Sequence, residues 1–517
     1  MFSAKSILCS ATALYCLNVA VLNTNTAAFV QSELNAAPAP GELLPTRQPK
    51  PVNKGAIFFA GFLCVVAWWL GMCGAAALWF DRKIPNAAVR RSNALAVAGV
   101  TIAWTLASAT YSFNSFRDLQ QAEKYEDYVP PAAGGGGSSN SGGAAADPTG
   151  NASNVHAALG SAWQFAGAAC LLAAALQRRG DNQGSDAHPG MASFFAGVGM
   201  MVAARATDTL GVGLLYLSPG QGDIGAQATL GSVAIYELRA IESVRNNPNI
   251  SPFDELAAIE NIQKEFAGLK STPGLGNLTR QDGQGIAAVS MVVNLVAFAT
   301  MVFAAKQRYQ ASGSHSRLQG AGVPALMLAF SSLAAQVFVL DAFALWEYSQ
   351  DPNDPGSCTQ NAQCLATRSM AATAVAGTCA LLGAIVCLAG AGAVLRARRT
   401  PLALWQTAVA VTLMLNNAIS SFADARVSQI SKDADPSLLD ELAVFRNALS
   451  AAAAFAFLGW AAAFAAVTFT WWTKHVDVDE GGRGSELNAS TPASDTPAAD
   501  LERGVPYATP TTNPANQ

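Results

Sequence analysis

The sequence predicts an all-α protein, a polytopic bundle of transmembrane helices built from repeated helical hairpins. Its composition is the first observation: 51% of the 517 residues are hydrophobic and 13% are charged, whereas soluble domains carry about 25% charged residues. The second observation is that long apolar runs come in pairs. The third is that each pair encloses a polar loop and ends in a short basic cluster, a pattern typical of hairpins whose ends face the cytosol.

The N-terminal residues 1–28 resemble a signal sequence. Lys5 supplies the positive start, Ile7–Leu22 the apolar region, and Thr26–Ala28 a small-residue cleavage site. The apolar region has about 16 residues, short of the roughly 20 that span a bilayer. A retained first membrane helix is the alternative, and Phe29 leaves a plastid-entry signal as a weaker one.

Nine further apolar windows are long enough to cross a membrane, which gives nine spans in the mature chain, or ten if the first run is retained. The windows are approximately 57–80, 92–114, 154–177, 191–217, 284–305, 321–347, 369–395, 402–424 and 446–472. The segments are an outer Pro-rich stretch 29–56, a single span 57–80, hairpins at 92–179, 191–308, 321–399 and 402–474, and a disordered cytosolic tail 475–517.

The outer loops carry the candidate modification sites. Sequons at Asn151, Asn249 and Asn277 lie in loops that the basic clusters assign to the outside, so we expect them to be glycosylated. Cys358 and Cys364 are the two cysteines in a polar loop. They should form a disulfide if that loop faces the secretory lumen, and two free thiols are the alternative.

The longest outer loop has apolar residues at helical spacing. We expect two amphipathic helices outside the membrane within 226–269. They either pack on each other and on the bundle or form a docking surface for another protein.

Charged residues recur at the outer ends of the spans. The first helix of each hairpin places an Asp there, and the second helix of three hairpins begins with a base. The candidates are Asp118 and His156, Arg205 and Asp208, Asp341 and Arg368, and Asp424 and Arg446. We interpret them as structural clasps between helices. Arg205, Asp208 and Asp341 alone are deep enough to line a transport path instead, and Asn294, Asn416 and Asn417 should hydrogen-bond across helices.

Motifs of catalysis are absent from the sequence. There is no GxxxxGK[ST], GxSxG, HExxH or CxxC pattern, so we predict no enzyme activity, no catalytic or metal-binding residues and no cofactor. The net charge of -4 and the lack of a basic stripe argue against nucleic acid as a partner. The expected partners are the lipid bilayer and other membrane or outer-surface proteins.

The outer hairpin loops, the inner termini, the outer cysteine pair and the string Ala451–Trp460 carry a resemblance. Over about 92–305 and 321–472 the chain resembles MARVEL-type and other four-span fungal plasma-membrane proteins, as if two units were joined. The resemblance implies a non-enzymatic organiser of a plasma-membrane domain or surface interaction. It extends to virulence-associated membrane proteins that fungal pathogens place at the growing tip. The alternative is a secondary transporter or channel that uses Arg205, Asp208 and Asp341.

Overall fold

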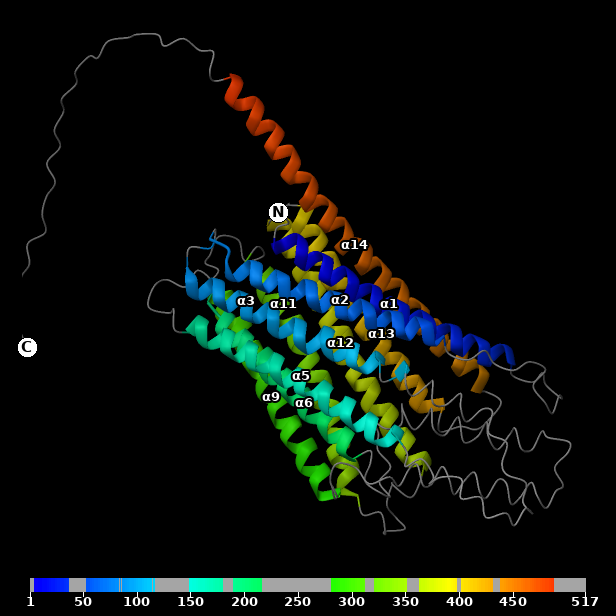
Figure 1. Cartoon of the computed structure of the whole chain (residues 1–517). Helices are drawn as coiled ribbons and strands as arrows, with labels where there is room; N and C mark the ends of the chain where they lie inside the picture. Colours follow the sequence, from blue (N-terminus) through cyan, green and yellow to red (C-terminus); the bar gives the residue numbers. More distant parts are fainter. Residues whose placement is uncertain are drawn as a thin grey trace, which may run out of the picture. The chain divides into compact units, whose positions relative to one another are not determined.

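The computed structural model confirms the all-α fold class. It describes residues 4–36, 53–82, 84, 86–113, 115–116, 148–179, 189–215, 280–311, 320–350, 362–397, 401–430 and 438–487, among which there is no strand. Ten α-helices are formed by these residues (Figure 1). They are α1 (Ala4–Ala36), α2 (Lys54–Trp79), α3 (Ala87–Thr101), α5 (Pro148–Arg179), α6 (Met191–Leu215), α9 (Arg280–Ala311), α11 (Gly322–Ser349), α12 (Ala362–Ala397), α13 (Pro401–Ile430) and α14 (Leu438–Leu487).

Eight of the described helices are long and apolar enough to cross a membrane, so the chain is a multi-pass membrane protein. They are α1, α2, α3 with its extension to Phe113, α5, α9, α11, α12 and α14. Each predicted window coincides with a helix. The predicted spans 191–217 and 402–424 are also helical, as α6 and α13, but these two helices are outside the set of eight.

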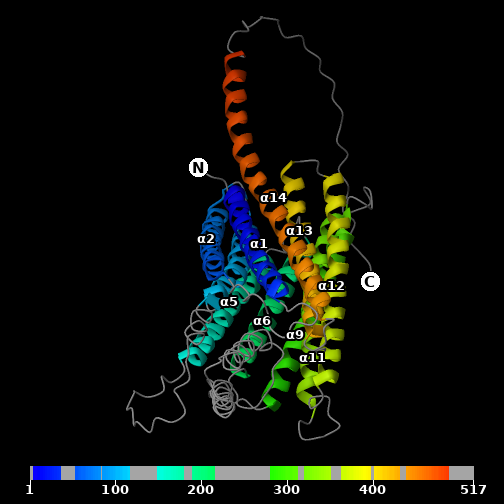
Figure 2. The same cartoon turned by 90° about the vertical axis from the view of Figure 1, so that its right-hand side faces the viewer.

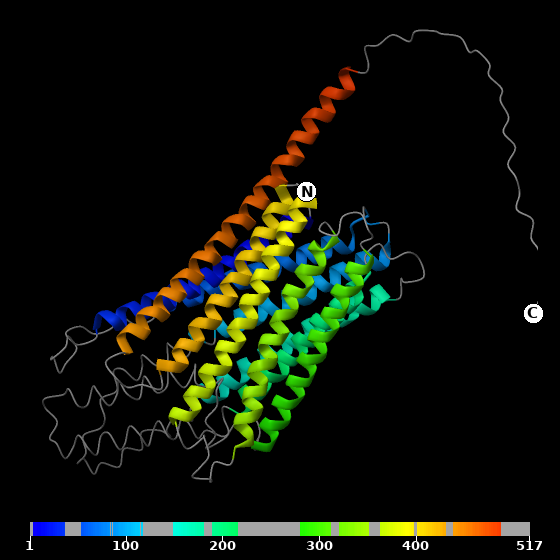
Figure 3. The same cartoon turned by 180° about the vertical axis from the view of Figure 1, so that it is seen from behind.

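Within the unit Met1–Thr470 the helices follow one another in chain order around a ring. Each helix from α1 to α13 packs on the next (Figures 2 and 3). On α14, the backbone carbonyl of Ala452 accepts a hydrogen bond from Asn416 Nδ2 of α13 at 2.6 Å. Gly459 of α14 lies against Thr412 of α13 and Cys16 of α1, which closes the ring.

Glycines permit close approach where these helices meet. A Cβ atom on Gly99 of α3 would lie 2.7 Å from the carbonyl oxygen of Gly167 on α5, and one on Gly167 would lie 2.6 Å from the carbonyl oxygen of Gly99. Small residues at crossing points are typical of helices that pack in lipid, where backbone approach replaces the hydrophobic effect as the source of contact.

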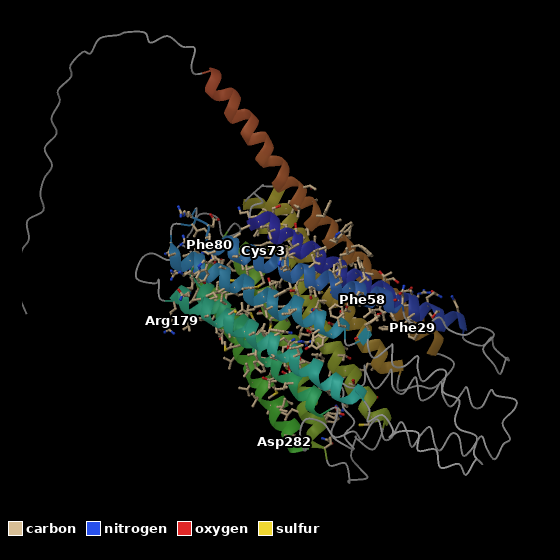
Figure 4. All side chains as sticks on the ribbon, in the orientation of Figure 1. Phe29, Phe58, Cys73, Phe80, Arg179 and Asp282 are labelled. Atoms are coloured by element: carbon tan, nitrogen blue, oxygen red, sulfur yellow. The ribbon has the colours of Figure 1, made fainter. Side chains whose placement is uncertain are left out.

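The outer faces of several helices are apolar and exposed, as a lipid environment requires. The exposed large side chains include Phe58 and Phe62 of α2, Val292, Leu295 and Phe303 of α9, and Leu382, Ile385 and Leu388 of α12. Figure 4 shows Phe58 on α2, and it places Arg179 of α5 and Asp282 of α9 at different ends of the bundle.

The N-terminal helix α1 runs without interruption through Thr26–Ala28, where the sequence suggested cleavage. Its residue Cys16 is fully buried, and the Asn25 side chain accepts a hydrogen bond from the Asn53 backbone N–H at 3.2 Å and donates one to the Asn53 carbonyl at 3.3 Å. Retention of α1 as a membrane helix and its removal as a signal sequence both stay predictions.

The C-terminal unit, Trp471–Gln517, differs from the predicted tail at its start. Helix α14 continues past residue 475 to Leu487, where we expected disorder. Adding residues to an existing helix fixes one residue for each new hydrogen bond, so the membrane span avoids the cost of nucleation for the segment that follows it.

Candidate intramembrane polar site

An aromatic layer fills part of the interior of the ring. The ring of Phe330 on α11 lies 5.9 Å from that of Phe194 on α6 and 6.4 Å from that of Trp104, both edge to face. Trp104 belongs to a π-helical segment, η1 (Ile102–Leu106), that interrupts α3. Edge-to-face contacts of this kind add to the free energy gained from burying the rings, so the layer is a packed seal between α3, α6 and α11.

The ionisable residues lie on the same helix faces as this aromatic layer. Arg205 follows Phe194 by eleven residues, and Asp341 follows Phe330 by eleven residues. Eleven residues are about three turns, so each charged side chain projects on the side of its aromatic partner, about 16 Å further along the helix. Both helices therefore present charge to the interior of the ring, beyond the aromatic layer.

Asp208 of α6 and Asp341 of α11 meet there as a pair of hydrogen-bonded carboxyl groups. Ser290 Oγ and Asn294 Nδ2 of α9 donate to Asp341 Oδ2 at 2.9 Å and 2.8 Å. Ser290 and Asn294 are fully buried, and Asp341 is 6% exposed. Two carboxylates that lie this close repel each other when both are ionised, so the arrangement is suited to holding a proton.

One oxygen beside the carboxyl pair has no hydrogen-bond partner in the part of the chain that the structure describes. Asn294 Oδ1 is buried and accepts no hydrogen bond, although the amide nitrogen of the same side chain binds Asp341. Buried polar atoms are normally satisfied, and exceptions concentrate at functional sites. No group of three or more His, Cys, Asp or Glu side chains suited to a metal ion occurs in the described part of the chain.

Arg205 is exposed although its helix face points into the ring. Its charge acts on Asp208, on Asp341, on Tyr15 of α1 and on Tyr111 near the end of α3. Arg205 is therefore an exposed cation on the same face of α6 as Phe194, with acidic and phenolic groups of neighbouring helices within reach of its charge.

The other predicted pairs are placed differently or lie outside the described side chains. The Arg368 guanidinium lies over the Trp346 ring at 5.9 Å, and within the described residues it forms no ion pair with Asp341. Arg446 donates hydrogen bonds to Gln31 of α1 and to Asn447.

Several predicted residues fall on segments that the structure does not describe. His156 and Asn151 lie on α5 and Asp424 on α13, with side chains outside the described set. Asp118, Asn249, Asn277 and the segment 226–269 lie wholly outside it.

The cysteine prediction falls partly on such a segment. Cys358 lies outside the described residues and Cys364 lies on α12, so their disulfide stays a prediction. The other seven cysteines carry free thiols.

The three asparagines expected to bond across helices do so, which confirms that prediction. Asn294 binds Asp341, Asn416 binds the carbonyl of Ala452, and Asn417 Nδ2 donates to Gln336 Oε1 of α11 at 3.0 Å. Ser290 was missed, although its place one turn before Asn294 was a usable signal. The π-helical segment was also missed, because no Gly or Pro in it marks the irregular turn.

Comparison of the chain with protein-family models, curated proteins and solved structures gave no match. The fold and the site thus define a class only: a multi-pass α-helical membrane protein with a pair of carboxyl groups inside its helix bundle. The similarity to MARVEL-type proteins rests on the sequence pattern alone.

Proposed function

We propose that this protein is a secondary transporter that takes up and releases a proton at the Asp208–Asp341 pair. The observation that carries the proposal is the pair itself, held by Ser290 and Asn294 between α6, α9 and α11. Ionisable groups inside a membrane bundle are costly, and where they persist they commonly mark ion pathways and proton relays.

The charge balance at the site favours proton exchange over a purely structural role. Two carboxyl groups stand against one guanidinium, Arg205. With one shared proton the pair carries one negative charge, which Arg205 balances, and gain of a second proton leaves the site positive. A structural ion pair between helices would need only one acid for each base. It would not need a carboxyl group that can exchange a proton.

The aromatic layer supports a transport role because it closes the interior at one level only. The Arg205 side chain is exposed, while Trp104, Phe194 and Phe330 are packed together about 16 Å away along α6 and α11. Access to a central site from one side at a time is the arrangement that alternating access requires. The π-helical segment that carries Trp104 is of a kind frequent at functional sites.

Proteoliposomes with a pH-sensitive dye inside test the proposal. The full-length protein should accelerate uptake of at least one solute from a panel of carboxylates, amino acids and sugars when an inward proton gradient is imposed. Asp341→Asn should reduce that uptake to the background of empty vesicles. Asp81→Asn, in the turn after α2, is the matched control and should keep wild-type uptake. Equal uptake in Asp341→Asn and wild type would contradict the role of the pair.

The membrane organiser that the sequence resemblance implies is the second candidate. Its expected interaction surface, 226–269, lies outside the described residues, so it has no geometric support of the kind that the carboxyl pair provides. For both candidates we propose a plasma-membrane location, a cytosolic C-terminus and α1 retained as a membrane helix. Wild-type uptake at background for every solute, with stable co-purification of other membrane proteins, would favour the organiser.

A further inference from the structure

We infer that Arg205 and Tyr111 form a binding site for a small carboxylate anion inside the ring of helices. The inference rests on the proposed function, because it names the substrate class of that transporter. It depends on a different set of atoms from the carboxyl pair: an exposed guanidinium and a buried phenol hydroxyl that lie near each other and have no hydrogen-bond partner among the described residues.

The position of Arg205 between two helix contacts fixes the direction of its side chain. The carbonyl oxygen of the preceding residue, Ala204, lies 3.4 Å from Ser290 Oγ of α9. Thr209, one turn later, donates to Gln164 Oε1 of α5 at 3.2 Å. Arg205 lies between the side of α6 that meets α9 and the side that meets α5. The same face of α6 carries Phe194, which contacts α11. The guanidinium therefore faces the interior, where lipid tails do not reach.

The guanidinium of Arg205 is a charge without a bonded neighbour. Within the described part of the chain it donates no hydrogen bond and makes no close ion pair, although several groups feel its charge. A guanidinium presents five N–H donors in a planar fork, and this geometry matches the two oxygens of a carboxylate. An arginine held inside a membrane bundle with its donors unused is an incomplete site.

Tyr111 supplies a second unused donor beside it. The Tyr111 hydroxyl oxygen is buried and has no hydrogen bond of normal geometry. Thr209 lies next to it. The single proton of the Thr209 hydroxyl is directed to the Arg205 carbonyl at 2.9 Å or to Gln164 Oε1 at 3.2 Å, and no hydrogen bond of normal geometry links Thr209 to the phenol. Gly160 of α5 makes room for the phenol, because a Cβ atom at Gly160 would lie 2.7 Å from the Tyr111 hydroxyl oxygen. An anion bound to Arg205 would give this hydroxyl its acceptor.

The charges around Arg205 link the anion to the proton. The titratable groups that face it are Tyr15 of α1, Tyr111 near the end of α3, Asp208 of α6 and Asp341 of α11. From α5 and α9 the neighbouring polar groups are uncharged: Gln164, Ser290 and Asn294. With one proton on the carboxyl pair the site is neutral. An arriving anion adds one negative charge, and a second proton on the pair restores neutrality, so anion and proton should bind together.

A thermal unfolding assay on the purified full-length protein tests this site without transport. The probes are acetate, lactate and inorganic phosphate, each titrated at mildly acidic and mildly basic pH. We expect a carboxylate to raise the unfolding midpoint, more strongly at acidic pH. Arg205→Gln should weaken its apparent binding roughly ten- to a hundredfold, the range expected when a charge-assisted hydrogen-bonding group is lost. Arg396→Gln, an exposed arginine in the last turn of α12, is the matched control and should bind as the wild type does.

Two further variants keep the test decisive. If Arg205→Gln does not fold, Arg205→Lys should still bind the carboxylate more weakly than wild type, because lysine cannot form the bidentate contact. Tyr111→Phe should weaken binding less than either change. Wild-type affinity in Arg205→Lys or Arg205→Gln would overturn the inference. So would the absence of any midpoint rise with carboxylates, or a larger rise with phosphate, which would indicate a phosphate or lipid headgroup instead.

The outcomes for the anion site and for the proton pair are separable. Proton-driven uptake that needs Asp341, together with no anion effect of Arg205, would overturn this inference and leave the proposed function in place. Anion binding that needs Arg205 and strengthens at acidic pH supports the inference, even where uptake by Asp341→Asn equals that of the wild type.

Discussion

The interior of the ring between α3, α6 and α11 differs sharply between two levels. At the level of Trp104, Phe194 and Phe330 it is packed with aromatic rings and contains no charge among its described residues. About 16 Å further along α6 and α11 it contains Arg205, Asp208 and Asp341. Helices α6 and α11 thus contribute aromatic rings at one level and charged side chains at the other.

The two levels depend on different physical terms. At the aromatic level, dispersion and shape hold the rings, so a truncated side chain leaves a cavity that the neighbours fill only partly. At the polar level, hydrogen bonds and charge decide the arrangement, so changes there should alter proton and anion binding before they alter the fold. The variants below are chosen to test this division.

The largest effect is expected at the aromatic level. Phe330→Ala removes the ring that contacts both Trp104 and Phe194, and we expect it to lower the free energy of unfolding by about 3–5 kcal/mol. Chemical unfolding in detergent measures the change. Phe303→Ala is the matched control, because Phe303 is 52% exposed on the outer face of α9. A loss as large in Phe303→Ala would contradict the assignment of the seal to Phe330.

Two buried serines, one at each level, allow a comparison of the polar level with the aromatic level. Ser290 donates across the helix interface to Asp341, whereas Ser331, next to Phe330, donates to the Leu328 carbonyl of its own helix at 2.7 Å. We expect Ser290→Ala to cost about 1.5–3 kcal/mol, the range for a hydrogen bond to a charged group, and Ser331→Ala less than about 1 kcal/mol. The same unfolding assay applies. Equal costs would show that Asp341 does not depend on Ser290.

Two glycines extend the comparison to the contacts between α3 and α5. Gly99→Ala pushes a methyl group against the Gly167 backbone, which cannot turn aside, so we expect a loss of about 1–3 kcal/mol. Gly160→Ala pushes instead on the end of the Tyr111 side chain, which can rotate. Its effect should be small in the unfolding assay and larger in anion binding. A larger loss of stability in Gly160→Ala than in Gly99→Ala would show that the rigid contact lies at Tyr111.

The sequence predicted the membrane fold well because its signals are local. Apolar run length placed each predicted window on a helix, and the asparagines within these windows were expected to find partners across helices. It did not predict that Asp208 meets Asp341 rather than a base. That contact depends on α6 and α11, which both pack on α9, approaching each other inside the ring, although hairpin geometry suggested Arg368 for Asp341. Arg368 lies over Trp346 instead, a contact between two helices that spacing along one helix does not indicate.

The smallest effect is expected at the contact between α14 and α1. Arg446 donates a hydrogen bond to Gln31, and this contact exists in the mature protein only if α1 is retained. Arg446→Ala and Gln31→Ala should each cost about 0.5–1 kcal/mol, and the double variant should cost less than their sum by about 0.5 kcal/mol, since both remove one contact near the surface. Ser450→Ala, whose hydroxyl bonds only the Arg446 carbonyl of its own helix, should not couple to Gln31→Ala. Strict additivity of Arg446→Ala with Gln31→Ala would mean that α1 is absent from the mature protein or does not contact α14, and an N-terminal tag lost from the purified chain would identify cleavage as the reason.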